Sequence, residues 1–205
     1  MLKNYWEHKL NIKTVNTRDR LFLPIIKLFS LLGFKPNDLS ILGFAFGILT
    51  LLSSTISIKL SAFFLLLAIL FDTWDGSLAR YLNKQTDRGK FLDMTIDIFV
   101  LTFALLAMVQ NNLINAVNGG LCIFLSLFTL VVIIIYKSFK YKITDWLFKA
   151  FAGIDGHIHK YILFAAYGLF AITSLNVLNE AVFISNIYLA IISFTYIIRI
   201  LKIKL

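Results

Sequence analysis

Four aspartates stand at helical spacing beside or inside strongly apolar sequence. Asp72 and Asp75 are three residues apart, and Gly89, Asp93 and Asp97 follow one another at steps of four. Such steps keep side chains on one face of a helix, so two helices could each point two carboxylates at one shared space. Hard oxygen ligands of this kind suit Mg²⁺ or Mn²⁺. The spacing therefore predicts a divalent-cation site formed by Asp72, Asp75, Asp93 and Asp97.

The energetic cost of these aspartates supports a functional interpretation. One aspartate at the centre of a membrane-spanning helix costs about 2.5–3.5 kcal/mol, so four deep ones would cost on the order of 10 kcal/mol. The alternative is that they are solvated or capping residues in loops, as we expect for Asp87. That alternative suits Asp93 and Asp97 poorly, because the apolar run 98–101 follows Asp97 directly.

The composition indicates an integral membrane protein. The chain has 205 residues, of which 59% are hydrophobic, with twenty Phe and two Pro, which is too apolar for a soluble domain of this size. No secretory signal fits the first twenty residues, since basic side chains interrupt them, so we expect the N-terminus to be retained. A net charge of +9 could suggest nucleic-acid binding, but the positions of the charges argue for no nucleic-acid partner.

The expected fold is all-α, with six transmembrane helices preceded by an amphipathic interfacial helix. Residues 1–17 form a polar leader, and 18–33 form the juxtamembrane helix, which Pro24 either starts or kinks and which Gly33 and Pro36 end. Residues 34–205 form the transmembrane catalytic domain. Its spans, each near the about 20 residues that a bilayer requires, are expected at 39–58, 60–82, 87–109, 116–136, 158–178 and 181–201.

The basic residues predict the orientation in the membrane. Seven precede the first span, four lie between the second and third, five lie around the fourth loop and three at the end, against Lys59 alone on the opposite side. The positive-inside rule then places both termini and the aspartate segment on the cytoplasmic side. The excess of positive charge also suits contact with anionic membrane lipids.

The segment from Asp72 to Asp97 resembles the motif of the CDP-alcohol phosphatidyltransferase family (class I CDP-alcohol phosphotransferases) in every fixed position. These positions are Asp72, Asp75, Gly76, Ala79, Arg80, Gly89, Asp93 and Asp97. A weaker match is Pro-Asn-Asp-Leu-Ser at 36–40, which resembles the opening of the family's first spanning helix. The helix plan agrees as well, so the resemblance covers about residues 18–201.

The resemblance implies transfer of a phosphatidyl or archaetidyl group from a CDP-linked lipid to a small polar alcohol, with release of CMP. The four aspartates would hold one or two Mg²⁺ or Mn²⁺ ions against the donor's pyrophosphate. Asp97 is the expected general base, taking the acceptor's proton as its oxygen attacks the lipid-side phosphorus. The family is commonly dimeric, so a homodimer is also implied.

Donor contacts are expected from Asn37, Ser40, Gly76, Ala79, Arg80 and Thr86. Gly76 and Ala79 lack bulk, so a nucleotide could approach the helix backbone, although small residues also serve ordinary helix packing. Thr86 could instead be the N-cap of the third span, with Gly89 as its third helical residue, and both roles are compatible. Asn37 and Ser40 could bind the cytidine end or cap the first span.

The acceptor site is expected around Lys140, Lys160 and Arg199. These cations could converge on the phosphate of an acceptor such as glycerol 3-phosphate or inositol phosphate, or could simply be positive-inside charges. Two departures from the family pattern leave the acceptor class open: His159 stands where Glu is frequent, and Ile98 follows Asp97 where Arg or Lys is usual. A non-phosphorylated acceptor such as serine is the alternative.

Other classes explain the sequence less well. His157 and His159 could form a second metal site with Asp155, but spacings of two residues in a Gly-containing loop favour this weakly. An intramembrane prenyltransferase would carry a second, separate aspartate motif, and none follows Asp97. A divalent-cation carrier would need acidic residues in the later spans, which contain none.

Overall fold

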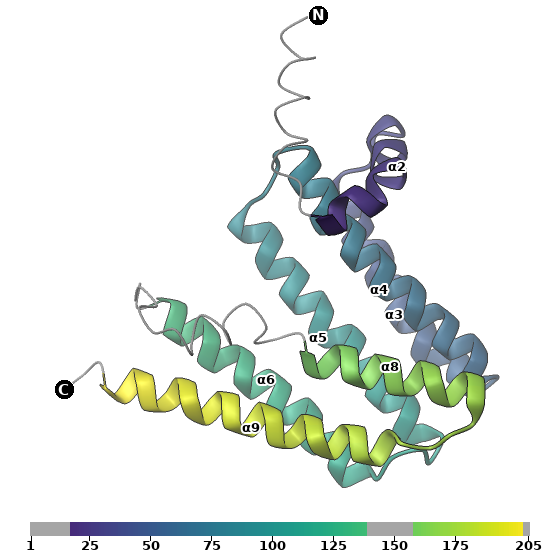
Figure 1. The fold of residues 1–205 in the computed structure, drawn as a ribbon, viewed down its shortest axis with the longest axis vertical. Helices are drawn as coiled ribbons and strands as arrows, with labels where there is room; N and C mark the ends of the chain where they lie inside the picture. Colours follow the sequence, from purple (N-terminus) through teal and green to yellow (C-terminus); the bar gives the residue numbers. More distant parts are fainter. Residues whose placement is uncertain (1–16, 139–157, 203–205) are drawn as a thin grey trace, which may run out of the picture. The chain divides into compact units, whose positions relative to one another are not determined.

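The computed structural model describes residues 17–138 and 158–202, and every regular element in these residues is a helix. Figure 1 shows the seven helices of the described part in chain order: α2 (Thr17–Leu31), α3 (Pro36–Ser54), α4 (Ile58–Tyr81), α5 (Asp87–Gln110), α6 (Ala116–Ser138), α8 (Ile158–Thr173) and α9 (Leu178–Lys202). The expected all-α class is therefore confirmed for the described residues.

Five helices of the described residues are long and apolar enough to cross a membrane. They are α3, α4, α5 from Phe91, α6 to Tyr136, and α9 to Leu201. The predicted span 158–178 corresponds to α8, whose 16 residues rise only about 24 Å, less than the roughly 30 Å of a bilayer core. Several apolar helices thus indicate an integral membrane protein, while the count of six spans stays a prediction.

Helix α2 matches the predicted juxtamembrane helix, and its end has a local cause. Gly33 adopts a left-handed conformation with φ of +81°, where a side chain would be strained. The amide of Phe34 donates to the carbonyl of Phe29 at 3.0 Å, and their rings meet edge to face at 5.5 Å, which completes a Schellman motif. Pro24 lies inside the helix and does not start it. A position of α2 at the membrane surface stays a prediction.

The connection between α4 and α5 is a tight reversal of five residues. At the end of α4, Asn83 has a φ of +52°, and the amide of Lys84 donates to the carbonyl of Ala79 at 2.9 Å. Thr86 then precedes the first residue of α5. The short connection brings the end of α4 and the start of α5 close together, so the aspartates of both helices lie within one short stretch of chain.

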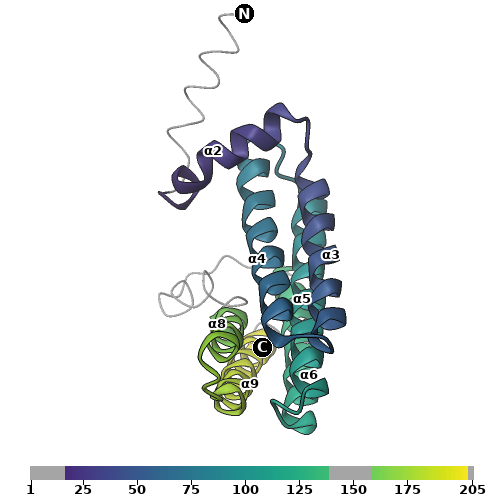
Figure 2. The same ribbon diagram turned by 90° about the vertical axis from the view of Figure 1, so that its right-hand side faces the viewer.

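The chain divides into two compact units. Unit 1 consists of residues 1–49 and 64–100, of which 17–49 and 64–100 are described, and unit 2 consists of residues 50–63 and 101–205. In unit 1, α2 lies across the ends of α3 and α4 (Figure 2), over a core of Ile26, Leu39 and Leu78. In unit 2, α9 packs against both α6 and α8, and its contact with α6 is formed around Val132, Ile133, Tyr136, Ile192 and Tyr196. The predicted domain boundaries stay a prediction.

Candidate functional site

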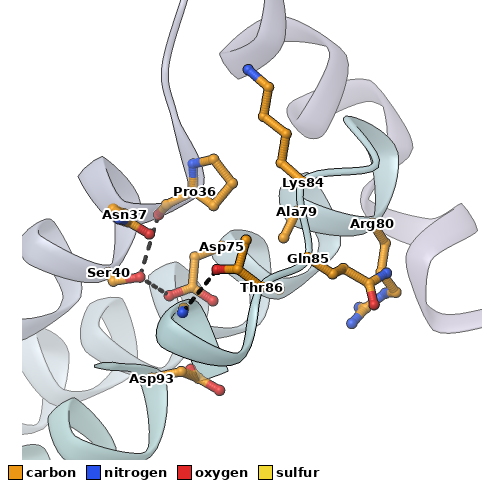
Figure 3. Close-up of a pocket in the computed structure, with 12 residues that line it drawn as sticks. Pro36, Asn37, Ser40, Asp75, Ala79, Arg80, Lys84, Gln85, Thr86 and Asp93 are labelled. Carbon is orange, nitrogen blue, oxygen red and sulfur yellow. Dashed lines mark hydrogen bonds between the residues drawn. The ribbon is translucent and has the colours of Figure 1, made fainter. Parts of the chain in front are cut away.

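A pocket of about 160 Å³ lies within unit 1, where the start of α3, the last turns of α4 and the start of α5 meet (Figure 3). Its lining comes from these three helices and from the reversal between α4 and α5: Pro36, Asn37, Ser40, Asp75, Gly76, Ala79, Arg80, Lys84, Gln85, Thr86, Gly89 and Asp93. The pocket therefore combines two acidic side chains, two basic side chains and several small residues.

The six residues expected to contact a CDP-linked donor all line this pocket. Two of them come from α3, three from α4 and one from the N-terminal boundary of α5: Asn37, Ser40, Gly76, Ala79, Arg80 and Thr86. The structure thus brings together positions that span fifty residues of sequence. Their contact with a donor stays a prediction, but their gathering is an observation.

The four aspartates lie inside helices and not in loops. Asp75 of α4 and Asp93 of α5 line the pocket, whereas Asp72 and Asp97 do not belong to its lining. The charges of Asp93 and Asp72 both act on the carboxylate of Asp75. Within the described residues, no three His, Cys, Asp or Glu side chains are close enough together to hold a metal ion as they stand. Metal binding by the four aspartates stays a prediction.

Asp75 is held by a hydroxyl group from another helix. Ser40 of α3 donates a hydrogen bond to Oδ2 of Asp75, as the dashed line in Figure 3 shows. Both side chains are buried, with 6% of Ser40 and 5% of Asp75 exposed. A hydrogen bond away from water is electrostatically stronger than one in water, so this contact orients the carboxyl group of Asp75.

The capping roles at α3 and α5 differ from one another. At α3, the backbone amide of Lys35 donates to the carboxylate of Asp38 at 2.8 Å, so Asp38 has a capping role at the start of this helix. A capping role of Asn37 or Ser40 stays a prediction. At α5, Thr86 accepts a hydrogen bond from the amide of Gly89 at 3.0 Å, which confirms its expected N-cap role. Thr86 also lines the pocket, so capping does not exclude a ligand contact.

Small residues leave space beside the cation of Arg80. A Cβ atom at Gly76 would lie 3.5 Å from Nη1 of Arg80, and a Cβ atom at Gly89 would lie 3.1 Å from the Thr86 hydroxyl. The other guanidinium nitrogen, Nη2 of Arg80, donates to the hydroxyl of Ser77 at 3.2 Å. The guanidinium is thus partly directed by its own helix, and a planar cation of this kind suits a phosphate group.

Four pocket residues were not among the predicted site residues: Pro36 and Gly89, which belong to the matched motifs, and Lys84 and Gln85, which do not. Lys84 and Gln85 line the pocket, yet the sequence pattern marked Lys84 only as a cytoplasmic charge. A local signal was present: both stand between Arg80 and Thr86, two predicted donor contacts separated by five residues. Because only five residues separate Arg80 from Thr86, residues between them are expected to lie near any ligand that both of them contact.

Two of the predicted acceptor residues, Lys160 and Arg199, belong to unit 2, and the third, Lys140, lies outside the described residues. Asp155 and His157 of the second metal site considered above also lie outside the described residues. Lys160 is only 4% exposed, and its neighbour His159 has Nε2 3.5 Å from the hydroxyl of Ser126. The acceptor role of these cations stays a prediction.

Comparison with known proteins agrees with this geometry. The sequence model described as CDP-alcohol phosphatidyltransferase matches residues 34–198, which include every pocket residue. An uncharacterized protein of Aquifex aeolicus (strain VF5) is 35% identical over 82 residues, a match that covers 40% of this chain and 42% of that protein. The chain therefore belongs to the CDP-alcohol phosphatidyltransferase family, whose members transfer a phosphatidyl group from a CDP-alcohol to an alcohol acceptor.

Proposed function

We propose that this protein synthesises a phospholipid by moving a phosphatidyl or archaetidyl group from a CDP-linked lipid to a small polar alcohol, with CMP as the other product. One observation carries the proposal: the six expected donor contacts and two aspartates of the motif line a single pocket in unit 1. The charge pattern supports a cytoplasmic position for this pocket, where water-soluble acceptors would reach it.

The residues of the pocket fit a divalent cation. Asp75 and Asp93 bring two carboxylates to the pocket, and the charge of Asp72 acts on the first of them. A donor pyrophosphate would add further negative charge. Cations would offset the charge of the carboxylate and pyrophosphate oxygen atoms, and Mg²⁺ or Mn²⁺ prefers oxygen ligands of this kind. Asp72, Asp75, Asp93 and Asp97 would hold one or two ions. When bound, the ions would offset the charge that develops on the leaving phosphate.

The side chains of the pocket would bind and orient the donor. The guanidinium of Arg80, directed by its hydrogen bond to Ser77, and the ammonium of Lys84 would contact phosphate oxygens. Gly76 and Ala79 would let the nucleotide approach the backbone of α4. Asn37 would contact the cytidine end, at the opening turn of α3.

Asp97 would act as the general base of the transfer. It lies on α5 one helical turn beyond Asp93. As the carboxylate takes the proton of the acceptor hydroxyl, the acceptor oxygen forms a bond to the lipid-side phosphorus. The bond from that phosphorus to the bridging pyrophosphate oxygen breaks, and CMP leaves with the electron pair. Positioning both reactants in one site supplies part of the rate enhancement.

The acceptor is proposed to be a phosphate-bearing alcohol such as glycerol 3-phosphate or inositol phosphate. Lys140, Lys160 and Arg199 would then bind its phosphate. A non-phosphorylated acceptor such as serine would not need these three cations. The protein is also proposed to act as a homodimer, as is common in this family.

A direct test uses the purified full-length chain in lipid nanodiscs with Mg²⁺ or Mn²⁺. CDP-diacylglycerol and CDP-archaeol are each combined with a panel of phosphorylated and non-phosphorylated alcohols. Mass spectrometry should detect CMP and a new phospholipid for at least one pair, and chelation by EDTA should stop both. If no combination yields CMP, the proposed function is wrong.

A further inference from the structure

The last turns of α4 carry two groups of side chains with different surroundings. Asp75, Gly76, Ala79 and Arg80 line the pocket. Phe71, Trp74 and Leu78 instead belong to a cluster with Phe22, Ile26 and Phe29 of α2, which we name the α2 cluster. At 100° per residue, the centres of the two groups are about 140° apart around α4, with Asp75 at the edge of the pocket group nearest the cluster. A rotation of these turns would therefore move both groups together.

Trp74 makes most of the ring contacts in the α2 cluster. Its ring centroid lies 5.6 Å from that of Phe29, 6.3 Å from that of Phe22 and 5.2 Å from that of Phe71, with tilted or edge-to-face geometry. Such arrangements are the favoured ones for aromatic pairs. Beside them, Ile26 and Leu78 are 1% and 0% exposed. Trp74 therefore joins α2 to the segment that carries Asp75.

The indole N–H of Trp74 contributes no hydrogen bond to this contact. Its Nε1 atom is buried and has no hydrogen-bond partner within residues 17–138 and 158–202. Leaving a donor unpaired in a buried place has a cost, so the packing of the ring must outweigh it. What Trp74 supplies is therefore a large flat surface, which another aromatic ring can partly replace.

The contact lies outside the features that the family match explains. The motif leaves the positions of Thr73, Trp74, Ser77 and Leu78 open, and α2 precedes the matched residues 34–198. Thr73 and Ser77 donate to carbonyl groups of α4 itself, at 2.9 and 3.0 Å. Trp74 and Leu78 are left to face α2. Of the four residues at positions that the motif leaves open, two bond to the backbone of α4 and two pack against α2.

We propose that Trp74 is a positioning residue for the transfer reaction. Its ring contacts with α2 fix the rotation of the last turns of α4, and thereby the direction in which Asp75 and Arg80 enter the pocket. On the pocket side, a hydrogen bond from Ser40 of α3 holds Asp75. A hydrogen bond between two side chains restricts rotation about the helix axis weakly, whereas rings packed closely between α4 and α2 resist it. This inference rests on the proposed function, because it concerns binding of the same donor.

The test measures equilibrium binding of CDP to the full-length chain in nanodiscs with Mg²⁺, by isothermal titration calorimetry. No acceptor is present, so binding is observed without turnover. Trp74→Ala should weaken CDP binding about tenfold or more, since small misplacements of binding groups have effects of this size. Trp74→Phe should restore binding to within about threefold, because the ring remains. Phe29→Leu, which alters the same contact from α2, should also weaken binding.

The matched control is Phe64→Ala. Phe64 also lies on α4 and stacks on Phe46 of α3 with ring centroids 6.2 Å apart, but it is ten residues, about 15 Å along the helix, before Trp74. It should lower the unfolding temperature without weakening CDP binding. A purely structural role of Trp74 would make the two alanine variants alike.

The possible outcomes separate this inference from the proposed function. Unchanged CDP binding in Trp74→Ala, or equal weakening in Phe64→Ala, would overturn the positioning role while the wild-type chain still binds CDP. If Trp74→Ala does not fold, Phe29→Leu decides in its place, and wild-type affinity in that variant overturns the role. A wild-type chain that binds no CDP would contradict the proposed function itself, and this inference would fall with it.

Discussion

Unit 1 and unit 2 both contain polar side chains among apolar helices, but the hydrogen-bonded hydroxyl groups of unit 2 and the pocket residues of unit 1 differ in what their polar atoms contact. In unit 2, the hydroxyl of Tyr167 donates to Ser61 at 2.9 Å, and Ser61 donates to the carbonyl of Thr50 at 2.7 Å. Thr129 and Ser193 are hydrogen-bonded at 2.7 Å. These groups are neutral and bond to one another. They explain how helices of a membrane protein are held together.

In unit 1, the polar set surrounds a pocket. It includes the carboxylates of Asp75 and Asp93 and the cations of Arg80 and Lys84, and its hydrogen bonds direct charged groups that line the cavity. Charged groups in membrane segments are costly and are usually retained for function. The difference teaches that burial of polar residues alone does not indicate a site in this protein. Charge that lines a cavity does.

The largest expected effect in this comparison is that of Asp97→Asn. Loss of the proposed base should lower turnover by about 10³-fold, because an amide cannot take the acceptor's proton. Folding should be close to wild type, and the loss of CDP binding that follows from the change at a proposed metal ligand should be much smaller than the loss of turnover. The measurement is CMP release under saturating donor and acceptor, with calorimetric CDP binding as the control. Turnover that survives this change would remove Asp97 from the base role.

Ser40→Ala should have the next largest effect. It removes the hydrogen bond that orients Asp75, and loss of a partner to a metal-binding carboxylate typically lowers metal affinity or activity about 10–100-fold. The Mg²⁺ concentration that gives half-maximal CDP binding should rise accordingly. Ser40→Thr keeps a hydroxyl and serves as the matched control. A Ser40→Ala protein with unchanged Mg²⁺ dependence would show that the bond is dispensable.

Lys160→Ala tests a charged residue of unit 2. If Lys160 binds a phosphate of the acceptor, the KM for that acceptor should rise about tenfold, while the KM for the donor changes by less than about twofold. Initial rates of CMP release with each substrate varied in turn give both constants. Equal changes in the two constants, or no change, would favour a role in topology alone.

Tyr167→Phe should have the smallest effect on activity. The change removes a neutral hydrogen bond to Ser61 and should lower the free energy of unfolding by about 0.5–1.5 kcal/mol. The kcat/KM of the folded protein should stay within about twofold of wild type. Reversible unfolding in mixed micelles and CMP release are the two measurements. If activity falls by more than the fraction of folded protein, the hydrogen bond of Tyr167 in unit 2 contributes to the reaction as well as to stability, and the contrast between the two units is wrong for this residue.

Much of the local structure could be predicted from the sequence. The end of α2 at Gly33, the cap of α5 at Thr86 and the helical positions of the four aspartates all depend on interactions within about five residues. The gathering of the donor residues was expected from the resemblance to the family. Lys84 and Gln85 escaped prediction because their residue types alone carry no motif.

Pairing between helices was decided by the tertiary structure. Ser40 and Asp75 are 35 residues apart, and their hydrogen bond depends on how α3 and α4 cross. At that crossing, a Cβ atom on Gly43 would already touch the carbonyl of Ala68 at 3.4 Å. Apolar side chains that face lipid resemble those that face protein, so periodicity in the spans cannot show which faces meet.

By itself, the sequence determined the helices, their local ends, the charge that indicates orientation and the motif that indicates the chemistry. These are set by neighbours along the chain and by the cost of charge in an apolar segment. Only the tertiary structure decided that Ser40 orients Asp75 and that Trp74 contacts α2. Such choices depend on the packing of residues distant in sequence, whose energies are known only once the helices are in place.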